Sequence, residues 1–486
     1  MSSNVFYTLQ KSSYLDTRLQ SYAKSDYYPF HMPGHKRASL EFPNPYTVDI
    51  TEIEGFDNLH HAEGILREAQ ARAAEVYNAK KTFYLINGST SGILSAISAA
   101  LPKRGTLLMS RNSHKAAYHA AYLRELETIY LLPLMTEFGI SGSVPPSHVE
   151  QALNDFPQVG CVFITSPTYD GVVSDIQAIA DIVHARNIPL IVDEAHGAHF
   201  TFSKEFPSSA LACGADLVIQ SLHKSLPCLT QTALLHVNSS RVDLDLLKRF
   251  LGIYQTSSPS YLLMASMEQC IRLMKEEGIT RMNDFTRLLR HFYKKTADLS
   301  HLQIFNKFSC SPDACFDQDM SKILISVGST GLTGKELYDL LLQKYHLQME
   351  MSSGHYVTAL SSMMDTEAGF QRLLFALEEI DRKYFLPEPD REHTLFTSDM
   401  IYQIPKPGMS ISQAIEQHTE ILSLKASTGH ISQEYIYLYP PGIPLVAPGE
   451  IMTGKLLGTI AQCQKQGLSV EGLSDMAGSR IKVVKM

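Results

Sequence analysis

Several kinds of sequence feature are missing from this chain of 486 residues. Its seven cysteines are scattered and form no Cys-x-x-Cys pair, which fits reduced thiols better than a disulfide framework. No apolar run approaches the roughly 18 residues that a membrane-spanning helix needs. The N-terminus also lacks the basic-then-apolar pattern of a secretory signal. We therefore expect a cytoplasmic protein with no membrane contact.

An excess of positive charge is missing as well. The formal net charge is −8 at pH 7, which weighs against nucleic acid as the main partner. The hydrophobic content of 44% and the charged content of 19% are ordinary for a globular protein. The length leaves room for several domains and a large core.

From about residue 62, apolar strand patterns alternate with helical patterns. Strands are predicted over residues 83–86, 106–110, 128–133, 160–165, 188–193, 216–220 and 232–236. Such alternation is typical of a mostly parallel sheet that is covered by helices on both faces. A helix from about Tyr261 to Lys275 is predicted to end this region.

We divide the chain into four parts: an N-terminal arm over 1–30, a cofactor-binding major domain over 31–279, a small α+β domain over 280–385 and a C-terminal domain over 386–486. Residues 386–391 have the composition of a linker. The C-terminal domain contains the proline-rich stretches 439–444 and 447–450, which cannot form a helix or a central strand.

Two neighbouring strands are followed by charged residues at the edge where open parallel sheets bind ligands. Asp193 closes the run 188–192, and Lys224 follows the run 216–220. A carboxylate under a pyridinium nitrogen and a lysine that forms a Schiff base are the pair that pyridoxal phosphate requires. The alternatives are a surface lysine, an Asp that caps the next helix, or a metal site of Asp193, His196 and His199.

A small-residue loop and several hydroxyl groups could surround such a cofactor. Residues 88–92 would present backbone N–H groups and the hydroxyls of Ser89, Thr90 and Ser91 to a phosphate, or they could simply cap a helix. Ser221 would add another hydroxyl. His114 could stack on a pyridine ring or begin a helix, and Thr165 could reach a ring oxygen or shape a turn.

Two later segments leave two interpretations open. The stretch 254–259 is either a helix start or a phosphate contact made across a dimer interface. Glu450 either pairs with the distal ammonium or guanidinium of a substrate, or occupies a favourable place before a helix over about 451–462.

Taken together, these segments resemble the bacterial ornithine/lysine/arginine decarboxylase family in its fold-type-I form, which depends on pyridoxal phosphate. The matching words, in chain order between about residues 29 and 450, are PFHMPGHKR, DITEIEGFDNLHHAEG, NGSTSG, SRNSHKA, SPTYDG, VDEAHGAH, SLHKSL, QTSSPSY and YPPGIPLVAPGE. The resemblance implies an α/β fold with a mostly parallel central sheet in the large domain and smaller α+β domains on the C-terminal side.

The resemblance also implies residue roles. Lys224 would hold the coenzyme covalently, Asp193 would contact its pyridine nitrogen, and His114 would stack on its ring beside His196. The complete cofactor-binding set would be Ser89, Thr90, Ser91, His114, Thr165, Asp193, Ala195, His196, Ser221, His223, Lys224, Thr256 and Ser257. Thr256 and Ser257 would reach the phosphate from a partner subunit. Glu450 and His35 would face the substrate, and no metal is expected.

The implied reaction is decarboxylation of a basic amino acid in polyamine biosynthesis, with arginine first and lysine next. Another pyridoxal-phosphate reaction, such as transamination, aldol cleavage or β-elimination, and an inactive regulatory protein that binds the coenzyme are the alternatives. About 30 residues precede the PGH word, where the large acid-inducible members carry an extra domain. We therefore expect a homodimer or a tetramer.

Overall fold

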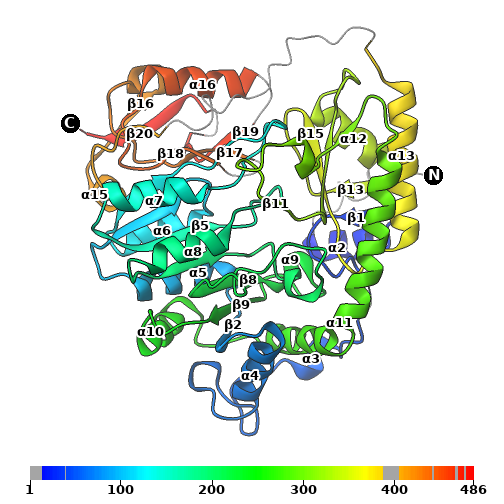
Figure 1. Cartoon of the computed structure of the whole chain (residues 1–486), viewed down its shortest axis with the longest axis horizontal. Helices are drawn as coiled ribbons and strands as arrows, with labels where there is room; N and C mark the ends of the chain where they lie inside the picture. The colour runs from blue at the N-terminus through cyan, green and yellow to red at the C-terminus, as the bar shows by residue number, and fades with distance from the viewer. Residues whose placement is uncertain are drawn as a thin grey trace.

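A seven-stranded sheet forms the centre of the computed structural model (Figure 1). The structure describes residues 14–38, 40–386, 404–439, 443–465, 469–475 and 478–485. The strand order of the central sheet is β2-β9-β8-β7-β5-β3-β4, and β9 is the one strand that runs opposite to the other six. The strands are β2 (Lys81–Leu85), β3 (Thr106–Ser110), β4 (Glu127–Leu131), β5 (Val159–Thr165), β7 (Leu190–Asp193), β8 (Leu217–Ser221) and β9 (Ala233–Val237).

Four strands of this sheet are buried from end to end, because helices cover both faces, whereas β2 and the edge strand β4 each begin with an exposed residue. Every residue of β3, β7, β8 and β9 is buried, as expected for a sheet with two covered faces. Ile191 packs in one apolar cluster while Leu190 and Val192 pack in another. All seven predicted strands are confirmed to within a few residues.

Each face has its own set of helices. The cluster on one face includes α5 (Gly88–Ala100), α6 (Lys115–Leu123) and α10 (Leu244–Tyr254). The cluster on the other face includes α4 (Ile65–Tyr77), α7 (Pro146–Asp155), α8 (Ile176–His184) and α11 (Tyr261–Thr296). The expected α/β architecture is present.

Helix α11 is longer than the sequence suggested. It runs for 36 residues along one side of the molecule and carries the major domain into the small one (Figure 1). The predicted helix end at Lys275 is therefore wrong, and the proposed limit at residue 279 falls inside the helix. Gly278 lies within this helix at a crowded position, where a Cβ would lie 3.0 Å from Cε of Met274 and 3.3 Å from Cδ1 of Phe202. The glycine therefore lets the helix pack closely against Phe202.

The small domain is built on an antiparallel sheet in the order β10-β12-β15-β14. Its elements are β10 (Gln303–Ile304), β12 (Lys322–Ser326), α12 (Gly334–Tyr345), β13 (Leu347–Met349), β14 (Met351–Ser352), β15 (Tyr356–Leu360) and α13 (Glu367–Lys383). Strand β1 (Tyr28–Phe30) pairs in parallel with β13. The end of the expected N-terminal arm thus belongs to the small domain.

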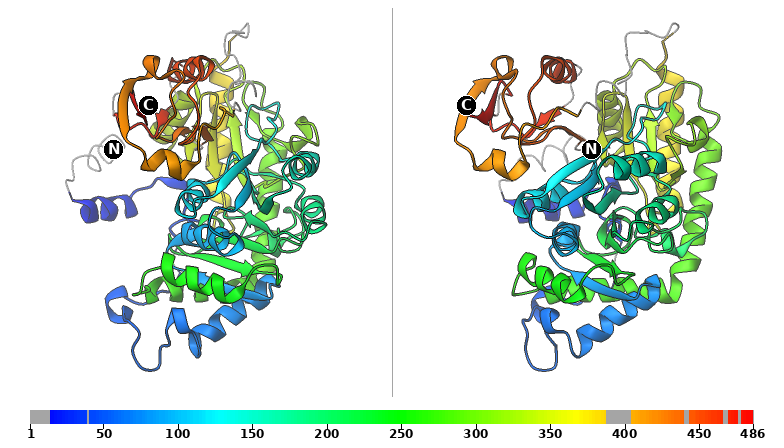
Figure 2. Two further views of the ribbon diagram at one scale, coloured as in Figure 1. Left: turned by 90° about the vertical axis from the view of Figure 1, so that its left-hand side faces the viewer. Right: turned by 60° about the vertical axis from the view of Figure 1, so that its left-hand side comes forward.

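The C-terminal elements stack beside the major domain, on the side away from α11 (Figures 1 and 2). They are α15 (Ile411–Glu416), β16 (Thr419–Ser423), β17 (Ile436–Tyr439), β18 (Ile443–Val446), α16 (Gly454–Lys465), β19 (Ser469–Glu471) and β20 (Arg480–Val484). Pro444 lies in β18, an edge strand of the sheet β18-β17-β19, which agrees with the exclusion of proline from central strands. Residues 440–442 and most of the expected linker lie outside the described residues.

Within the part of the chain that the structure describes, no helix is both long enough and apolar enough to span a membrane.

Candidate active site

The predicted acid and lysine lie at the carboxyl edge of the central sheet. Strand β7 ends at Asp193, and β8 ends at Ser221 and leads into the short helix α9 (Leu222–Ser225) that carries Lys224. Across the sheet, Thr165 at the end of β5 is in register with Asp193. Parallel strands therefore bring these groups to one edge, where ligands bind in such sheets.

Lys224 is partly buried and points toward an imidazole. Its Nζ lies 3.1 Å from Nε2 of His196. Burial lowers the pKa of the Lys224 amine, and the carboxylates of Asp193 and Glu350 oppose this shift. A lowered pKa favours the neutral amine, which is the form that attacks an aldehyde.

Asp193 is 4% exposed. Its Oδ1 accepts a hydrogen bond from the backbone N–H of Ala195 at 3.1 Å. Burial raises the pKa of the Asp193 carboxyl, while the Lys224 cation and that backbone N–H oppose the shift. Ala195 therefore acts through its backbone, which also accepts from the N–H of Ser221 at 3.3 Å. A positively charged ring nitrogen facing Asp193 would stabilise its ionised form.

Two hydroxyls beside this pair are buried without a partner in the described structure. They are Oγ of Ser221 and Oγ of Ser225. A buried polar atom without a hydrogen bond costs about 1–3 kcal/mol, so such atoms call for a ligand. An anionic group with several acceptor oxygens would satisfy them.

The start of α5 supplies a second set of groups for an anion. Ser89 and Thr90 lie in its first turn and are not buried. The hydroxyl of Ser91 donates to the carbonyl of Gly88 at 2.9 Å within this first turn, and its contact with a phosphate stays a prediction. The helix is 13 residues long, so its free N–H groups favour negative charge at this end.

Thr256 and Ser257 lie beside this helix start and are exposed. The N–H of Thr256 donates to Oδ1 of Asn87 at 3.4 Å, and its carbonyl lies 2.9 Å from Nε2 of His60. These contacts place the loop near the predicted phosphate site of its own chain. Whether a partner subunit's loop contributes stays a prediction.

His114 is the N-cap of α6, and its Nδ1 accepts from the N–H of Ala116 at 3.2 Å. More than a third of its surface is exposed. Surrounding groups remove water from the imidazole, and this desolvation, followed by the Lys224 cation, lowers the pKa of His114 to about 4. The ring is therefore neutral near pH 7 and lies close enough to Lys224 to sense its charge. Thr165 is turned toward Ser113, with 3.4 Å between the hydroxyl oxygens.

The PGHK segment packs directly against α9. The N–H of Gly34 donates to the carbonyl of His223 at 2.7 Å, and a Cβ on Gly34 would lie 2.7 Å from the backbone nitrogen of Leu226. His223 contacts the carbonyl of Thr232 through Nδ1 at 2.9 Å. His35 accepts from the N–H of Arg37 at 3.1 Å. The segment thus forms one wall beside the predicted site.

His196 lies between two lysines, one of which the sequence analysis missed. Nδ1 of His196 lies 2.6 Å from Nζ of Lys322, the first residue of β12. Lys322 is 3% exposed, and burial lowers its pKa to about 8. Its only sequence signal is a cationic residue that begins an otherwise apolar strand. Glu350 was missed as well; it accepts from Tyr169 Oη at 2.7 Å and from the N–H of Met32 at 2.9 Å.

Glu450 has a different environment from the one predicted for a substrate contact. Its two carboxylate oxygens lie 2.5 and 2.9 Å from the guanidinium nitrogens of Arg111, and the N–H of Ala447 donates to it at 2.8 Å. Arg111 and Glu450 are 1% and 3% exposed. The charge of Glu450 is already neutralised within the chain, because the C-terminal domain places it on the arginine that follows β3.

The contacts of His196 and His199 also weigh against the metal alternative. Both ring nitrogens of His196 contact lysine amines. Nε2 of His199 lies 3.2 Å from Oδ1 of Asp319. Because both ring nitrogens of His196 already contact amines, neither is free to ligate a metal ion in this arrangement.

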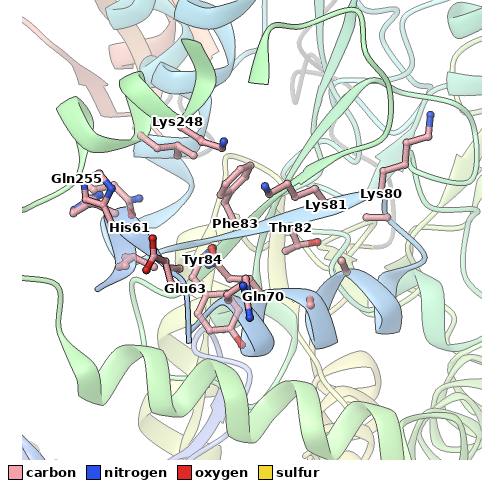
Figure 3. A pocket seen from close by; sticks show the side chains of 18 of the residues that line it. His61, Glu63, Gln70, Lys80, Lys81, Thr82, Phe83, Tyr84, Lys248 and Gln255 are labelled. Atoms are coloured by element: carbon pink, nitrogen blue, oxygen red, sulfur yellow. The ribbon is translucent and has the colours of Figure 1, made fainter. Parts of the chain in front are cut away.

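A cavity of about 650 Å³ lies elsewhere, between α4, β2 and α10 (Figure 3). Lys81, Phe83 and Lys248 line it together with Gln255. Gln255 also accepts from the N–H of Ile86 at 2.9 Å. The cavity therefore borders the loop of Thr256 without including Lys224 among the described lining residues.

Comparison with known proteins adds the family. Residues 14–321 match the Orn/Lys/Arg decarboxylase major domain, and residues 390–469 match the C-terminal domain of the same family. An arginine decarboxylase of Bacillus subtilis is 30% identical over 485 residues, covering 98% of each chain. The constitutive lysine decarboxylase of Escherichia coli is 23% identical, covering 90% of this chain and 74% of its own.

The solved structure of a lysine decarboxylase from Francisella novicida shows the same fold. Its TM-score is 0.79 at 18% sequence identity, covering 99% of this chain and 81% of that chain. The sequence comparison and the fold comparison therefore both match this chain to decarboxylases.

Proposed function

This chain belongs to the Orn/Lys/Arg decarboxylase family, and we propose that it removes the α-carboxylate of arginine to give agmatine and CO2. Membership makes it a fold-type-I carboxy-lyase that depends on pyridoxal phosphate. The proposal for its site rests on one observation: Lys224, Asp193 and the unpaired hydroxyl of Ser221 share the carboxyl edge of the sheet.

The residues present fit the coenzyme. The unpaired hydroxyls of Ser221 and Ser225 and the start of α5 suit a phosphate. The buried Asp193 suits a protonated pyridine nitrogen, and the amine of Lys224 suits the aldehyde. When bound, pyridoxal phosphate supplies a cationic ring that accepts the electron pair of the bond to the departing carboxylate.

The side chains around it would bind, orient and hold protons. Lys224 would fix the coenzyme and yield to the substrate amine, and Asp193 would keep the proton on the ring nitrogen. His114, neutral near pH 7, would cover one face of the ring without adding charge. Substrate selection and bond orientation would decide that the carboxylate leaves, because the bond held perpendicular to the ring is the one that breaks.

Arginine is the first choice of substrate because relatives named arginine decarboxylase match nearly the whole chain at 30% identity. Relatives named lysine decarboxylase match at 23% or below and are longer than this chain. Lysine is therefore the second choice. A role in polyamine biosynthesis follows from the proposed product, which is a precursor of diamines.

We also propose a homodimer. The segment 53–61 carries exposed apolar side chains and touches the loop of Thr256 through His60. A partner subunit that covers this surface would lie near the start of α5 and could bring its own hydroxyls toward the phosphate.

The test is CO2 release from arginine, lysine and ornithine by the purified protein loaded with coenzyme. Arginine should give the highest kcat/KM, and Lys224→Ala should lose both turnover and the visible absorbance of enzyme-bound coenzyme. Transfer of the amino group or β-elimination in place of CO2 release would support another reaction on this fold. Coenzyme uptake without turnover of any amino acid would indicate a regulatory protein instead.

A further inference from the structure

A carboxylate of the small domain lies beside the site without a cationic partner. Glu350 directly follows β13, and its side chain is partly buried. Its Oε1 accepts a hydrogen bond from Oη of Tyr169 at 2.7 Å, and its Oε2 accepts one from the N–H of Met32 at 2.9 Å. Among the residues that the structure describes, no side chain forms an ion pair with Glu350. Glu450 differs, because Arg111 already neutralises its charge.

A chain of side-chain contacts joins Glu350 to Lys224. The ring of Tyr169, which donates to Glu350, lies edge-on to the ring of His196 with the centroids 5.2 Å apart. Nε2 of His196 in turn lies 3.1 Å from Nζ of Lys224. One phenol and one imidazole therefore separate the carboxylate from the lysine amine.

The PGHK segment holds the other oxygen of Glu350 near the same lysine. Met32 donates to Glu350 through its backbone, and Gly34 follows two residues later. The N–H of Gly34 donates to the carbonyl of His223 at 2.7 Å, and His223 directly precedes Lys224. Both contacts that orient the carboxylate thus come from walls of the site.

The charge of Glu350 is felt inside the site. Burial lowers the pKa values of Lys224 and Lys322, and the carboxylate of Glu350 is one of the groups that oppose this shift at both amines. A negative charge therefore acts at the lysine where the substrate amine would react, although no ion pair with that lysine is formed.

The carboxylate also retains acceptor capacity. An ionised carboxylate offers about four acceptor positions on its two oxygens, and Tyr169 and Met32 occupy two of them. The guanidinium of arginine presents its donors in a planar fork that matches the two oxygens of a carboxylate. A basic amino acid whose α-amine reacts at Lys224 would extend its side-chain cation away from that lysine. A partly buried carboxylate with unused acceptor positions is the partner that such a cation requires.

We propose that Glu350 binds the distal guanidinium of the substrate, with Tyr169 and the backbone of Met32 orienting its carboxylate. The inference rests on the proposed function for the identity of the cation, and it gives Glu350 the role that the sequence analysis assigned to Glu450. The guanidinium lies far from the bond that breaks, so this contact contributes equally to the binding of the substrate and of the transition state. Its loss should therefore change KM more than kcat.

Two ligands that differ only in the distal charge test this contact. Agmatine carries the guanidinium, and its urea analogue, N-carbamoylputrescine, carries a neutral group of the same shape. Both share the primary amine at the other end, so its reaction with the coenzyme affects both equally, and neither has a carboxylate to lose. Calorimetry on the coenzyme-loaded protein should show about tenfold or tighter binding of agmatine. Equal affinities for the two ligands would overturn the proposal.

Glu350→Gln removes the charge while keeping both contacts. The amide oxygen can accept from the N–H of Met32, and the amide N–H can donate to the hydroxyl oxygen of Tyr169. Agmatine affinity should fall by about 10- to 100-fold, while the affinity for the urea analogue should change by less than about threefold. The KM for arginine should rise by a similar factor, with kcat changed far less. Equal weakening of both ligands would show that Glu350 is structural and would contradict the proposal.

Two further variants complete the test. Tyr169→Phe keeps the charge but removes one hydrogen bond that orients it, so the preference for agmatine should fall by about three- to tenfold. An unchanged preference would contradict the proposal even if Glu350→Gln fails to fold. Glu378→Gln, at an exposed position on α13, removes a charge from the same domain and should bind both ligands as the unchanged protein does. Absence of CO2 release from every amino acid, with the preference for agmatine intact, would contradict only the proposed function.

Discussion

Burial moves the two central groups of the site toward their neutral forms, since it lowers the pKa of Lys224 and raises that of Asp193. Each is also the other's counterion. A lysine ready to attack and an acid that needs a cationic partner are what a protonated coenzyme ring would use. Burial at the edge of the sheet therefore shifts the pKa values of both groups in the direction that the coenzyme chemistry uses.

The Asp193→Asn variant tests whether the carboxylate of Asp193 stabilises the protonated ring nitrogen of the coenzyme. The amide keeps the size of the side chain but cannot stabilise a protonated ring nitrogen, so kcat/KM should fall by about 10²–10³-fold, while the coenzyme stays bound through its phosphate contacts. Steady-state CO2 release and coenzyme content, measured together, check this. Asp181→Asn, on the exposed side of α8, is the control. Full activity of Asp193→Asn would remove Asp193 from the reaction.

A second residue, His236, predicts a pH dependence of stability. It is buried on β9 between Thr82 and Gln220, at 2.8 and 3.1 Å, and desolvation lowers its pKa to about 3. The folded state therefore resists a proton that the unfolded chain accepts near pH 6.5. The contribution of neutral His236 to the free energy of unfolding is therefore complete above about pH 6.5, and it declines below that pH by about 1.4 kcal/mol per pH unit.

The corresponding measurement compares denaturant midpoints at pH 7.5 and 5.5. His236→Gln should show a smaller loss on acidification than the unchanged protein, by about 1 kcal/mol. His148→Gln, at an exposed position on α7, should keep the full loss. An unchanged acid sensitivity in His236→Gln would mean that other groups account for it.

At the scale of elements, the contact between the PGHK segment and α9 holds two parts of the chain at backbone distance. A methyl group at position 34 would meet the backbone of Leu226 at 2.7 Å, so Gly34→Ala must push the segment away from the helix that carries Lys224. We expect weaker coenzyme retention and at least a tenfold loss of kcat/KM. Gly454→Ala, where a Cβ meets nothing within 4 Å, is the matched control, and equal behaviour of the two variants would contradict this account.

The Arg111–Glu450 pair attaches the C-terminal domain to the end of β3. Glu450→Gln would leave the guanidinium buried without its counterion, which costs about 3–5 kcal/mol. Thermal unfolding and limited proteolysis should therefore reveal a loosened C-terminal domain. Arg111→Met combined with Glu450→Met should recover part of the stability. A stable Glu450→Gln protein with a raised KM for arginine would instead restore Glu450 as a substrate contact.

These elements show what the sequence can and cannot reveal. The strands were predictable because both faces of the sheet are covered, so the inner strands such as β3 and β7 are almost continuous apolar runs. Asp193 and Lys224 were predictable because each follows such a run. Lys322 and the partner of Glu450 were not, because their contacts join residues 126 and 339 positions apart. Helix α11 was underestimated, because the prediction ended it at Lys275 whereas the structure continues it to Thr296.

At the scale of the whole molecule, one surface carries apolar side chains with little local cover. Tyr46 is 95% exposed, Ile53 50% and Phe56 45%. Phe56 lies against Tyr261 with ring centroids 6.4 Å apart, and His60 links the same segment to the loop of Thr256. Clustered exposed apolar groups are typical of interaction surfaces. This surface is where we place the homodimer interface.

Phe56→Glu tests that placement, because a buried charge would oppose association. Light scattering on the size-exclusion peak should give twice the chain mass of 54.2 kDa for the unchanged protein and a shift toward 54.2 kDa for the variant. If the partner's loop completes the phosphate site, coenzyme affinity should fall with dimer content as the protein is diluted. Phe308→Glu, at another exposed aromatic residue, should stay dimeric. A monomeric unchanged protein with full coenzyme content would show that each chain forms its site alone.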